Sequence, residues 1–598
     1  MPIVSVAIAG PWWTLLSYYN ETSLPKNVRV RVPLGVSGKS ARVGLTCGGG
    51  ESPDNIDLKS IAEVIDETPP LPAELTQTIG WFGRNWFLGY GMAMKTLLPS
   101  KFLKGEKLVS LSADSERQQT AMRTTYIFQP SDRKRYFSYV EMLEGSGSDS
   151  LVMFPEVAQA KSFWDMLPEG LKAVGLLWLE TGQKKQWELW QRVRLGDFCF
   201  IVGSPAASCL PMPKISRIIV DDELSAAWRT QKHPEFHRRS LLAARCRNAG
   251  AELVLGGRMP SSKVALQDAG DSHSKKGIEK RTVFVSLHDT ESFEAADIKG
   301  KLPISLPLVR ETRKALEAGR FAMWILDRKG YAGEIFCDEC GLAVVCRRCG
   351  RAMRWEEKNR RIFCTYCSYV DCIPDVCPSC KSGFLAGQRP GIEAIAERAK
   401  ILFRNRGEVV QFDDKMKAAE LMEKHRSGAL LIGTRKIIAL SDILPVSLAG
   451  WIDADGEARS TEYDSRVRAL GLIWESAWRG CCPEDRTVVV QSRRPGQDWQ
   501  GALRSGWGSF WRRELKERKV LGLPPFMPML KIITPRRKGP ELARRLSSLD
   551  FDFWQSDESE DEVWVRTRHF EKLRSVLDVY FEINKTRVGM PALTLYLD

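Results

Sequence analysis

The stretch CDECGLAVVCRRCGRAMRWEEKNRRIFCTYCSYVDCIPDVCPSC, residues 337–380, contains four C-x-x-C pairs and decides how the chain is organised. A C-x-x-C turn presents two thiolates to one tetrahedral metal, and two such turns complete a structural zinc site. Eight paired thiolates therefore predict two Zn²⁺ ions per chain. Redox dithiols or disulfides are the alternative, which four pairs within so short a segment disfavour.

The four pairs could share two ions in three ways. Fourteen residues separate Cys349 from Cys364, close to the usual zinc-ribbon spacing, and this favours one ion for the two inner pairs. We interpret the ninth cysteine, Cys372, as a spare thiol. The predicted ligands are Cys337, Cys340, Cys377 and Cys380 for zinc 1, and Cys346, Cys349, Cys364 and Cys367 for zinc 2.

Length and composition limit the number of domains, the class of protein, its compartment and its kind of partner. The 598 residues predict three to five domains, and 43% hydrophobic residues is ordinary for a globular protein. We expect no membrane span and no signal peptide, because no run of eighteen apolar residues occurs and the first residues lack a basic region. Scattered cysteines outside the cluster indicate a reducing compartment. A net charge of +14 favours a polyanionic partner, of which nucleic acid is the commonest.

The first 105 residues predict a small β-rich unit followed by a helix pair. Short β-branched runs alternate with Gly and Pro, and the stretch from 72 to 100 has the pattern of two amphipathic helices. In VRVRVPLG (28–35), Arg29 and Arg31 share one strand face and the valines share the other. A basic face of this kind suits phosphate binding, although a solvated edge strand would have the same pattern.

From residue 121 onward the chain alternates apolar strands with helical segments, which predicts parallel α/β sheets. The expected strands are 151–154, 174–179, 198–203, 217–222, 252–257, 282–287 and 322–326 before the cysteines, and 429–434, 447–453 and 487–492 after them. This pattern places the cysteine-rich module between two α/β lobes. The tail from about 510 predicts a smaller α+β unit.

This arrangement resembles the primosomal protein N′ family, PriA, whose members restart stalled replication forks. The resemblance is carried by ILDRKGYAGEIFCDECG (325–341), by IIVDDELSAAWRTQKHPEFHRRSLLAAR (218–245) for the Asp-Glu-Glu-His segment, by FPEVAQA (154–160), by GTRKIIALSDILPVSLAGWIDAD (433–455) and by GLPPF (522–526). It implies an α/β multidomain fold with two RecA-like helicase-type lobes, an inserted double zinc-binding module, a β-rich N-terminal DNA-binding domain and a small α+β C-terminal domain. In that family the cysteines are shared in the nested manner favoured above.

The domains expected on this basis are 1–105 (N-terminal, 3′-end binding type), 121–330 (lobe 1), 331–385 (zinc module), 386–509 (lobe 2) and 510–598 (C-terminal). Residues 106–120 form the linker, which is too short for the family's winged helix, so that domain is expected to be missing. Gly35 keeps a family position beside Arg29 and Arg31, and these three are the expected DNA-binding residues. Ser17 stands where the family usually has an Asp, which puts the contact to a terminal 3′ hydroxyl in doubt.

The motor motifs depart from the family. A phosphate-cradling G-x-x-x-x-G-K-[ST] loop is absent, and FQPSDRKRYFSY (128–139) stands in its place, with Lys134 where the catalytic lysine would lie. Leu224 replaces the family's His, GGRMPSS (256–262) departs from the coupling motif, and WESAWRGCC (474–482) keeps one of two arginines. We therefore expect no catalytic residues and no ATP turnover, and the same departures put ATP binding in doubt. The degenerate remnants are Lys134, Asp221, Asp222, Glu223 and Arg479.

The sequence thus predicts a restart factor that recognises stalled or abandoned forks, binds branched and single-stranded DNA, and promotes primosome assembly without helicase activity. The resemblance implies primosome proteins, the replicative helicase, its loader and single-stranded DNA-binding protein as partners, no membrane, and a bacterial cytoplasmic, nucleoid-associated location. One alternative is an active 3′→5′ helicase with a divergent loop around Lys134. Another is an unrelated zinc-ribbon protein, which the flanking α/β lobes disfavour.

Overall fold

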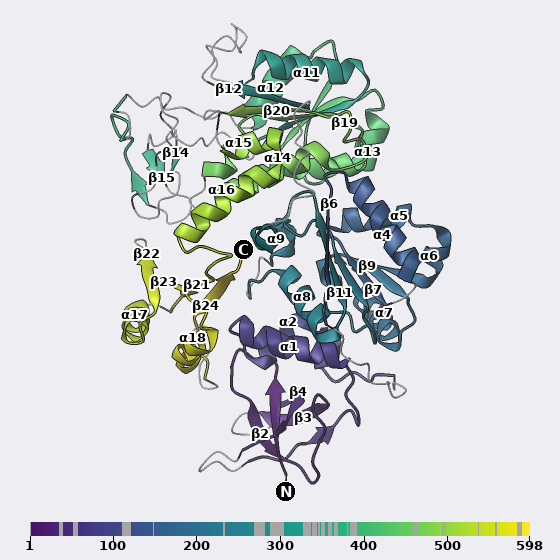
Figure 1. Ribbon diagram of the computed structural model, residues 1–598, viewed down its shortest axis with the longest axis vertical. Coiled ribbons are helices and arrows are strands. Elements are labelled where there is room, and N and C mark those ends of the chain that lie inside the picture. The colour runs from purple at the N-terminus through teal and green to yellow at the C-terminus, as the bar shows by residue number, and fades with distance from the viewer. Residues whose placement is uncertain are drawn as a thin grey trace. The chain divides into compact units, whose positions relative to one another are not determined.

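A computed structural model gives the fold (Figure 1). It describes residues 2–34, 40–51, 58–109, 121–146, 149–230, 234–267, 281–287, 304–326, 337, 344, 347, 353–356, 361–363, 369–378, 381–382, 392–459, 463–492, 496, 498–535, 537–556, 559–582 and 589–598. The chain forms two compact units. Unit 1 comprises Met1–Ile127, Phe137–Gly256 and Gly522–Asp598, and unit 2 comprises Phe128–Tyr136 and Gly257–Leu521.

Unit 1 begins with an antiparallel five-stranded sheet in the order β2-β1-β4-β3-β5. Val28, Val30 and Val32 are fully buried on one side of the expected basic strand, as their alternation predicts. The strands are β1 (Ile3–Ile8), β2 (Leu16–Tyr19), β3 (Arg29–Leu34), β4 (Ser40–Gly49) and β5 (Glu63–Val64). The expected helix pair follows as α1 (Ala73–Asn85) and α2 (Tyr90–Leu97), with the short α3 (Ser100–Leu103).

The first α/β sheet has the order β6-β11-β10-β7-β9-β8, and the pairs from β11 to β8 are parallel, as expected. Its strands are β6 (Thr124–Phe128), β7 (Ser150–Met153), β8 (Gly175–Trp178), β9 (Phe200–Gly203), β10 (Arg217–Val220) and β11 (Glu252–Gly257). The helices between them are α4 (Asp132–Ser146), α5 (Val157–Met166), α6 (Glu169–Val174), α7 (Gln183–Leu195) and α8 (Arg238–Ala249).

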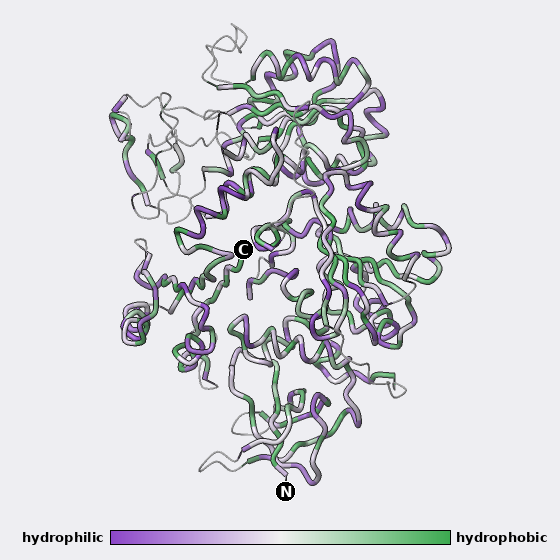
Figure 2. The backbone as a smooth tube through the Cα atoms, in the orientation of Figure 1, coloured by the Kyte–Doolittle hydropathy of each residue, from purple (hydrophilic) through white to green (hydrophobic). Residues whose placement is uncertain are grey.

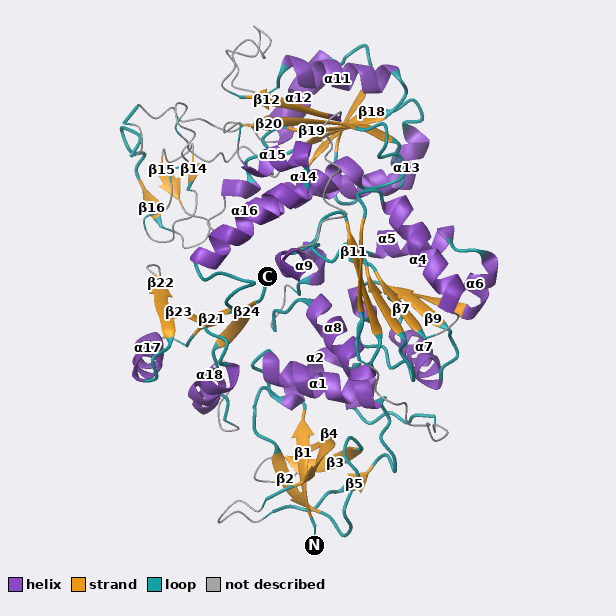
Figure 3. Ribbon diagram, in the orientation of Figure 1, coloured by secondary structure: helices purple, strands orange, loops and turns teal. Residues whose placement is uncertain are grey.

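Unit 2 holds a second six-stranded sheet, ordered β12-β20-β19-β13-β18-β17 and parallel throughout. Its strands are β12 (Thr282–Ser286), β13 (Phe321–Ile325), β17 (Glu408–Gln411), β18 (Ala429–Gly433), β19 (Val446–Trp451) and β20 (Thr487–Ser492). Figure 3 shows α11 and α12 on one face of this sheet and α14 on the other. The helices of unit 2 are α9 (Ser262–Gln267), α11 (Leu306–Glu317), α12 (Ile392–Leu402), α13 (Ala418–Lys424), α14 (Ser465–Trp478), α15 (Asp498–Ser505) and α16 (Trp507–Val520).

Two expected boundaries are wrong. Strands β12 and β13 belong to the second sheet, so the first lobe ends before residue 282, and the cysteine-rich segment interrupts the second lobe instead of separating the two. Strand periodicity reports burial and carries no information about which sheet a strand joins. The boundary at 510 would cut α16, whose helix meets no breaker until Gly522 and the prolines that follow.

The C-terminal part of unit 1 is a four-stranded antiparallel sheet, ordered β22-β23-β21-β24, with two helices. Trp13 and Phe581 stack with ring centroids 4.3 Å apart, and the Arg574 guanidinium lies 4.0 Å from the Trp13 ring centre. These contacts join the first and last parts of unit 1. The elements are β21 (Met529–Ile533), α17 (Gly539–Ser548), β22 (Asp552–Ser556), β23 (Ser559–Arg566), α18 (Phe570–Leu577) and β24 (Ala592–Tyr596).

Candidate functional site

The stretch that replaces the phosphate loop forms the end of β6 and the start of α4, and Asp132 is the first residue of that helix. A helix N-terminus favours negative charge, because its first backbone N–H groups lack intrahelical partners and the helix dipole is positive there. Phosphate groups commonly occupy such positions. In this chain a carboxylate of the protein itself stands there.

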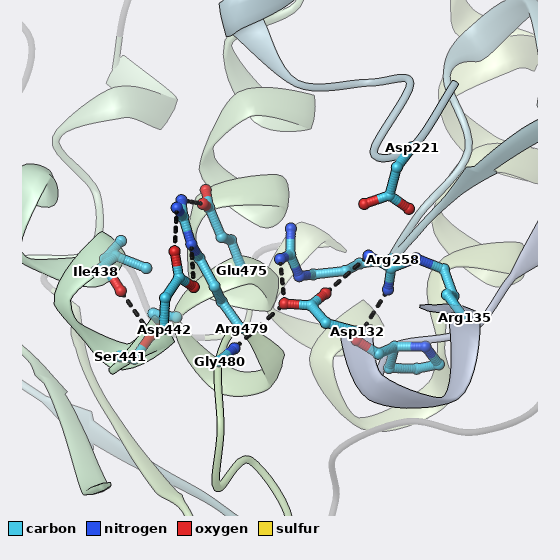
Figure 4. Close-up of polar contacts among 12 residues, drawn as sticks. Asp132, Arg135, Asp221, Arg258, Ile438, Ser441, Asp442, Glu475, Arg479 and Gly480 are labelled. Atoms are coloured by element: carbon cyan, nitrogen blue, oxygen red, sulfur yellow. Dashed lines mark hydrogen bonds and ion pairs between the residues drawn. The ribbon is translucent and has the colours of Figure 1, made fainter. Parts of the chain in front are cut away.

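The Asp132 carboxylate accepts hydrogen bonds from three donors (Figure 4). Its Oδ1 lies 2.7 Å from Arg135 Nη2, and its Oδ2 lies 2.8 Å from Arg258 Nη2. The backbone N–H of Gly480 donates to the same Oδ2 at 3.2 Å. All four residues belong to unit 2. Asp132 and Arg135 come from the segment in place of the phosphate loop, Arg258 from GGRMPSS, and Gly480 from WESAWRGCC.

The electrostatics of the cluster favour an ionised Asp132. Burial alone would raise the pKa of this carboxyl, but the positive charges of Arg258 and Arg135 and their hydrogen bonds outweigh burial and lower the pKa to about 2. The two guanidiniums are almost completely enclosed. Because buried charges are costly unless paired, the carboxylate and the arginines stabilise one another only as a set.

Gly480 brings its N–H to the carboxylate through a backbone conformation that other residues rarely adopt. Its φ is +100°, and a Cβ at this position would lie 2.0 Å from the carbonyl oxygen of Ser441. Any larger residue would therefore clash with backbone and be strained. The donor to Asp132 Oδ2 thus depends on glycine at this position.

Arg479, the remaining arginine of the second lobe's motif, is 2% exposed and fully engaged. Its Nε and Nη2 donate to the two carboxylate oxygens of Asp442 at 2.9 and 2.8 Å, and Nη1 donates to Glu475 at 2.7 Å (Figure 4). Burial raises the pKa of Asp442, with Arg479 opposing that rise. A forked pair of this geometry fixes the guanidinium in place.

The former Mg²⁺ segment at the end of β10 also has internal partners. Asp221 is buried, and its Oδ1 accepts a hydrogen bond from the Tyr139 hydroxyl at 2.9 Å. Glu223 is buried in an ion pair with Arg239. Asp222 has a positive φ of 45°. An arginine thus neutralises the Glu223 carboxylate, which makes it a poor Mg²⁺ ligand.

Lys134 lies exposed on the first turn of α4, two residues after Asp132. The contacts of Asp132 come instead from Arg135 and Arg258, which the sequence did not single out. A signal was nevertheless present. The two segments that depart from the phosphate-loop and coupling motifs contain an acidic residue, Asp132, and a basic residue, Arg258.

The two arginines expected to bind DNA differ in exposure. Arg29 is 1% exposed, and its guanidinium forms a forked pair with Asp66, with Nε–Oδ2 and Nη2–Oδ1 distances of 2.8 and 2.9 Å. Its Nη1 donates to the carbonyl of Phe102, which connects β3 to α3. Arg31 reaches solvent, and its Nε lies 2.7 Å from Glu63. DNA contact through these arginines stays a prediction, and Arg31 is the one whose charge is accessible.

Two further expected features lie in or near the same sheet. Gly35 lies outside the described residues. The Ser17 hydroxyl, at the position where the family usually has an Asp, donates to the carbonyl of Glu51 at 2.9 Å. This bond ties β2 to the end of β4, and it gives Ser17 a structural partner within the domain.

Two of the eight predicted zinc ligands, Cys337 and Cys377, lie within the described residues, and both are fully buried. Cys337 Sγ lies 3.0 Å from Ser382 Oγ, and the Ser382 carbonyl accepts the N–H of Cys377 at 2.7 Å. Cys337 therefore lies beside the segment that contains Cys377 and Ser382. The other six, Cys340, Cys346, Cys349, Cys364, Cys367 and Cys380, lie outside the described residues, whereas Cys372 is described and exposed.

Residues 5–99 match the family model for the 3′DNA-binding domain (3′BD) of PriA. The replication restart protein PriA of Treponema pallidum is 25% identical over 540 residues, covering 83% of this chain and 80% of that protein. The PriA of Borreliella burgdorferi is 22% identical, with 82% and 78% covered, and that of Haemophilus influenzae is 24% identical, with 70% and 59% covered.

The chain is therefore a multidomain protein with parallel α/β sheets and an N-terminal domain of the 3′DNA-binding type. Over most of its length it is similar to replication restart proteins of the PriA family. This confirms the resemblance drawn from the sequence.

Two solved structures share a more distant likeness. RecG bound to a three-way DNA junction aligns with a TM-score of 0.36 and 10% identity, covering 67% of this chain and 44% of that one. The DUF1998 helicase MrfA bound to DNA aligns with a TM-score of 0.34 and 10% identity, covering 66% and 46%. The chain thus spans less than half of each. Among the described residues, no helix is long and apolar enough to cross a membrane.

Proposed function

We propose that this protein is a replication restart factor that recognises stalled or abandoned forks and binds their branched and single-stranded DNA. It then promotes primosome assembly and reloading of the replicative helicase in the bacterial cytoplasm, without unwinding DNA itself. Support for the DNA-binding part comes from the match of residues 5–99 to the 3′DNA-binding domain. Primosome proteins, the replicative helicase, its loader and single-stranded DNA-binding protein are the proposed partners.

The observation that carries the loss of ATP turnover is the Asp132 carboxylate at the start of α4, bound by Arg135, Arg258 and the Gly480 N–H. Phosphoryl transfer depends on donors that hold the phosphates and stabilise their developing charge. Here the donors already hold a fixed anion. A nucleotide phosphate would have to displace a carboxylate whose pKa is about 2, and Arg479 is held by Asp442 and Glu475.

We further propose two structural Zn²⁺ ions. The adjacency of Cys337 to the turn that contains Cys377 supports a site shared by the outer C-x-x-C pairs, Cys337/Cys340 and Cys377/Cys380. The inner pairs, Cys346/Cys349 and Cys364/Cys367, would then hold the second ion. When bound, zinc would hold these turns together as a rigid module.

ATP hydrolysis and fork binding, measured on the same purified protein, test this proposal. We expect salt-sensitive binding to a synthetic fork and no DNA-stimulated release of phosphate. A DNA-stimulated ATPase that disappears in both Lys134→Ala and Asp221→Asn would establish the alternative, a helicase with a divergent loop. Absence of fork binding would remove the restart proposal itself.

A further inference from the structure

Helix α16 (Trp507–Val520) has two chemically distinct faces. Trp507, Phe510 and Trp511 are buried, and the Trp511 indole N–H donates to the Pro260 carbonyl at 3.1 Å, which fixes the helix within unit 2. Arg512, Lys516 and Lys519 are exposed. Spacings of four and three residues place these cations on one side of a helix, spread over about 10 Å of its length.

The acidic residues of α16 do not neutralise this side. Glu514 pairs with Arg518 at 2.9 Å and with Arg466 at 2.8 Å. Glu517 pairs with Arg466 as well. Both carboxylates are therefore used by other arginines, while Arg512, Lys516 and Lys519 make no ion pair within the described part of the chain.

The same side continues as a polar surface toward the start of the helix. Ser509, three residues before Arg512, is partly exposed, and its hydroxyl lies 2.7 Å from that of Ser505. Figure 2 shows hydrophilic residues along much of α16. Hydroxyls and long cationic side chains are the groups that contact nucleic-acid phosphates without reading base sequence. Three unneutralised cations also attract a polyanion more strongly than a mixed-charge face would.

We propose that Arg512, Lys516 and Lys519 form a binding surface for the phosphate backbone of DNA. This α16 basic stripe lies in the second lobe, outside the matched 3′DNA-binding domain, and it would give the protein a second, sequence-independent contact. The inference rests on the proposed function only in requiring that the protein binds DNA. Charge complementarity selects DNA as the occupant, because the three exposed side chains of the stripe are positive and both carboxylates of α16 are paired with Arg466 or Arg518.

The test compares the triple variant Arg512→Ala, Lys516→Ala and Lys519→Ala with the wild type on a synthetic fork and on matching single-stranded and duplex DNA. Losing three phosphate contacts should reduce the slope of log K against log salt by about 2 to 3. Raising the salt from about 50 to 200 mM weakens binding by both proteins. The fold loss of affinity should be about 40 times smaller for the variant than for the wild type. A matched control, Lys415→Ala, Lys424→Ala and Arg426→Ala, removes the same charge from exposed positions of unit 2.

The charge-keeping variant Arg512→Lys, Lys516→Arg and Lys519→Arg should bind with the wild-type slope. The double variant Lys516→Gln and Lys519→Gln should give an intermediate slope, and it keeps the test available if the triple variant folds poorly. If the wild type binds the fork and the α16 variants behave as the matched control does, the stripe is not a DNA contact and the restart proposal survives. If the wild type binds no DNA, both proposals are overturned.

Discussion

Asp132 and Arg258 stand 126 positions apart in the sequence, and their side chains meet at 2.8 Å in the interior of unit 2. Each belongs to a segment that departs from a motor motif. Their charges are complementary, so the two segments that depart from the motor motifs are joined by an ion pair. Loss of either side chain should therefore leave a buried charge without its partner.

Replacing Asp132 with Ala should destabilise unit 2 by about 3–5 kcal/mol, because two buried guanidiniums would lose their shared carboxylate. Urea denaturation followed by tryptophan fluorescence measures the loss. The control is Asp165→Ala, which removes an exposed carboxylate from α5 and should change stability by less than about 0.5 kcal/mol. Equal effects of the two substitutions would mean that the cluster contributes nothing to stability.

The stability contributed by Asp132 should depend on pH. The pKa of its carboxyl is lowered to about 2 in the folded protein, so its contribution is complete above about pH 4 and is lost as pH falls through about 2. The depression corresponds to about 2.5 kcal/mol. The wild type should therefore exceed Asp132→Asn in stability by less at pH 2 than at pH 5. Burial raises the pKa of Asp442, and the Asp132 charge adds to that rise, so Asp132→Asn should also bring the Asp442 pKa down. If the difference in unfolding free energy between the wild type and Asp132→Asn were the same at pH 2 and pH 5, the lowered pKa of Asp132 would be contradicted.

Metal analysis should find two zinc ions per chain. Cys346→Ser and Cys364→Ser should each lose the same ion, and Cys337→Ser and Cys377→Ser should each lose the other. Structural zinc contributes on the order of 10 kcal/mol of folding free energy per site in small peptides, so each loss should also lower the unfolding temperature. Cys372→Ser is the matched control and should keep both ions. One zinc per chain in the wild type would refute the two-site reading.

Substitutions of Arg29 and Arg31 should have different effects: loss of Arg29 should lower stability, and loss of Arg31 should weaken DNA binding. Arg29→Ala breaks a buried forked pair with Asp66, and we expect the N-terminal domain to lose about 3 kcal/mol. Arg29→Lys should restore little of this, because an ammonium cannot reproduce the fork. Arg31→Ala should change stability by less than about 1 kcal/mol and reduce the salt slope of fork binding by about 1. Unchanged fork binding in Arg31→Ala would remove Arg31 from the interface.

Most strands of the two six-stranded sheets were predictable from sequence, except the edge strands β6 and β17, whereas their assembly was not. Runs such as 217–222 and 487–492 reveal burial through their β-branched composition, and both are strands. The membership of β12 and β13 in the second sheet depends on contacts with β18, β19 and β20, which lie far away in sequence. For the same reason the motif departures were visible, but the pairing of Asp132 with Arg258 was not. The burial of Arg29 was hidden because its partner Asp66 lies on another segment.

The position of the cysteine-rich segment in the second lobe has a thermodynamic consequence. Leu326, just after β13, and Ile392, the first residue of α12, are packed in the same hydrophobic core of the second lobe. Folding this lobe therefore closes a loop of 65 residues, whose entropic cost grows with the length of flexible chain. Metal-bound turns would cross-link this segment and so reduce the entropic cost of closing the loop. Chelation should then weaken cooperativity in the flanking lobe as well as in the insertion, so that metal supply and lobe stability become thermodynamically linked.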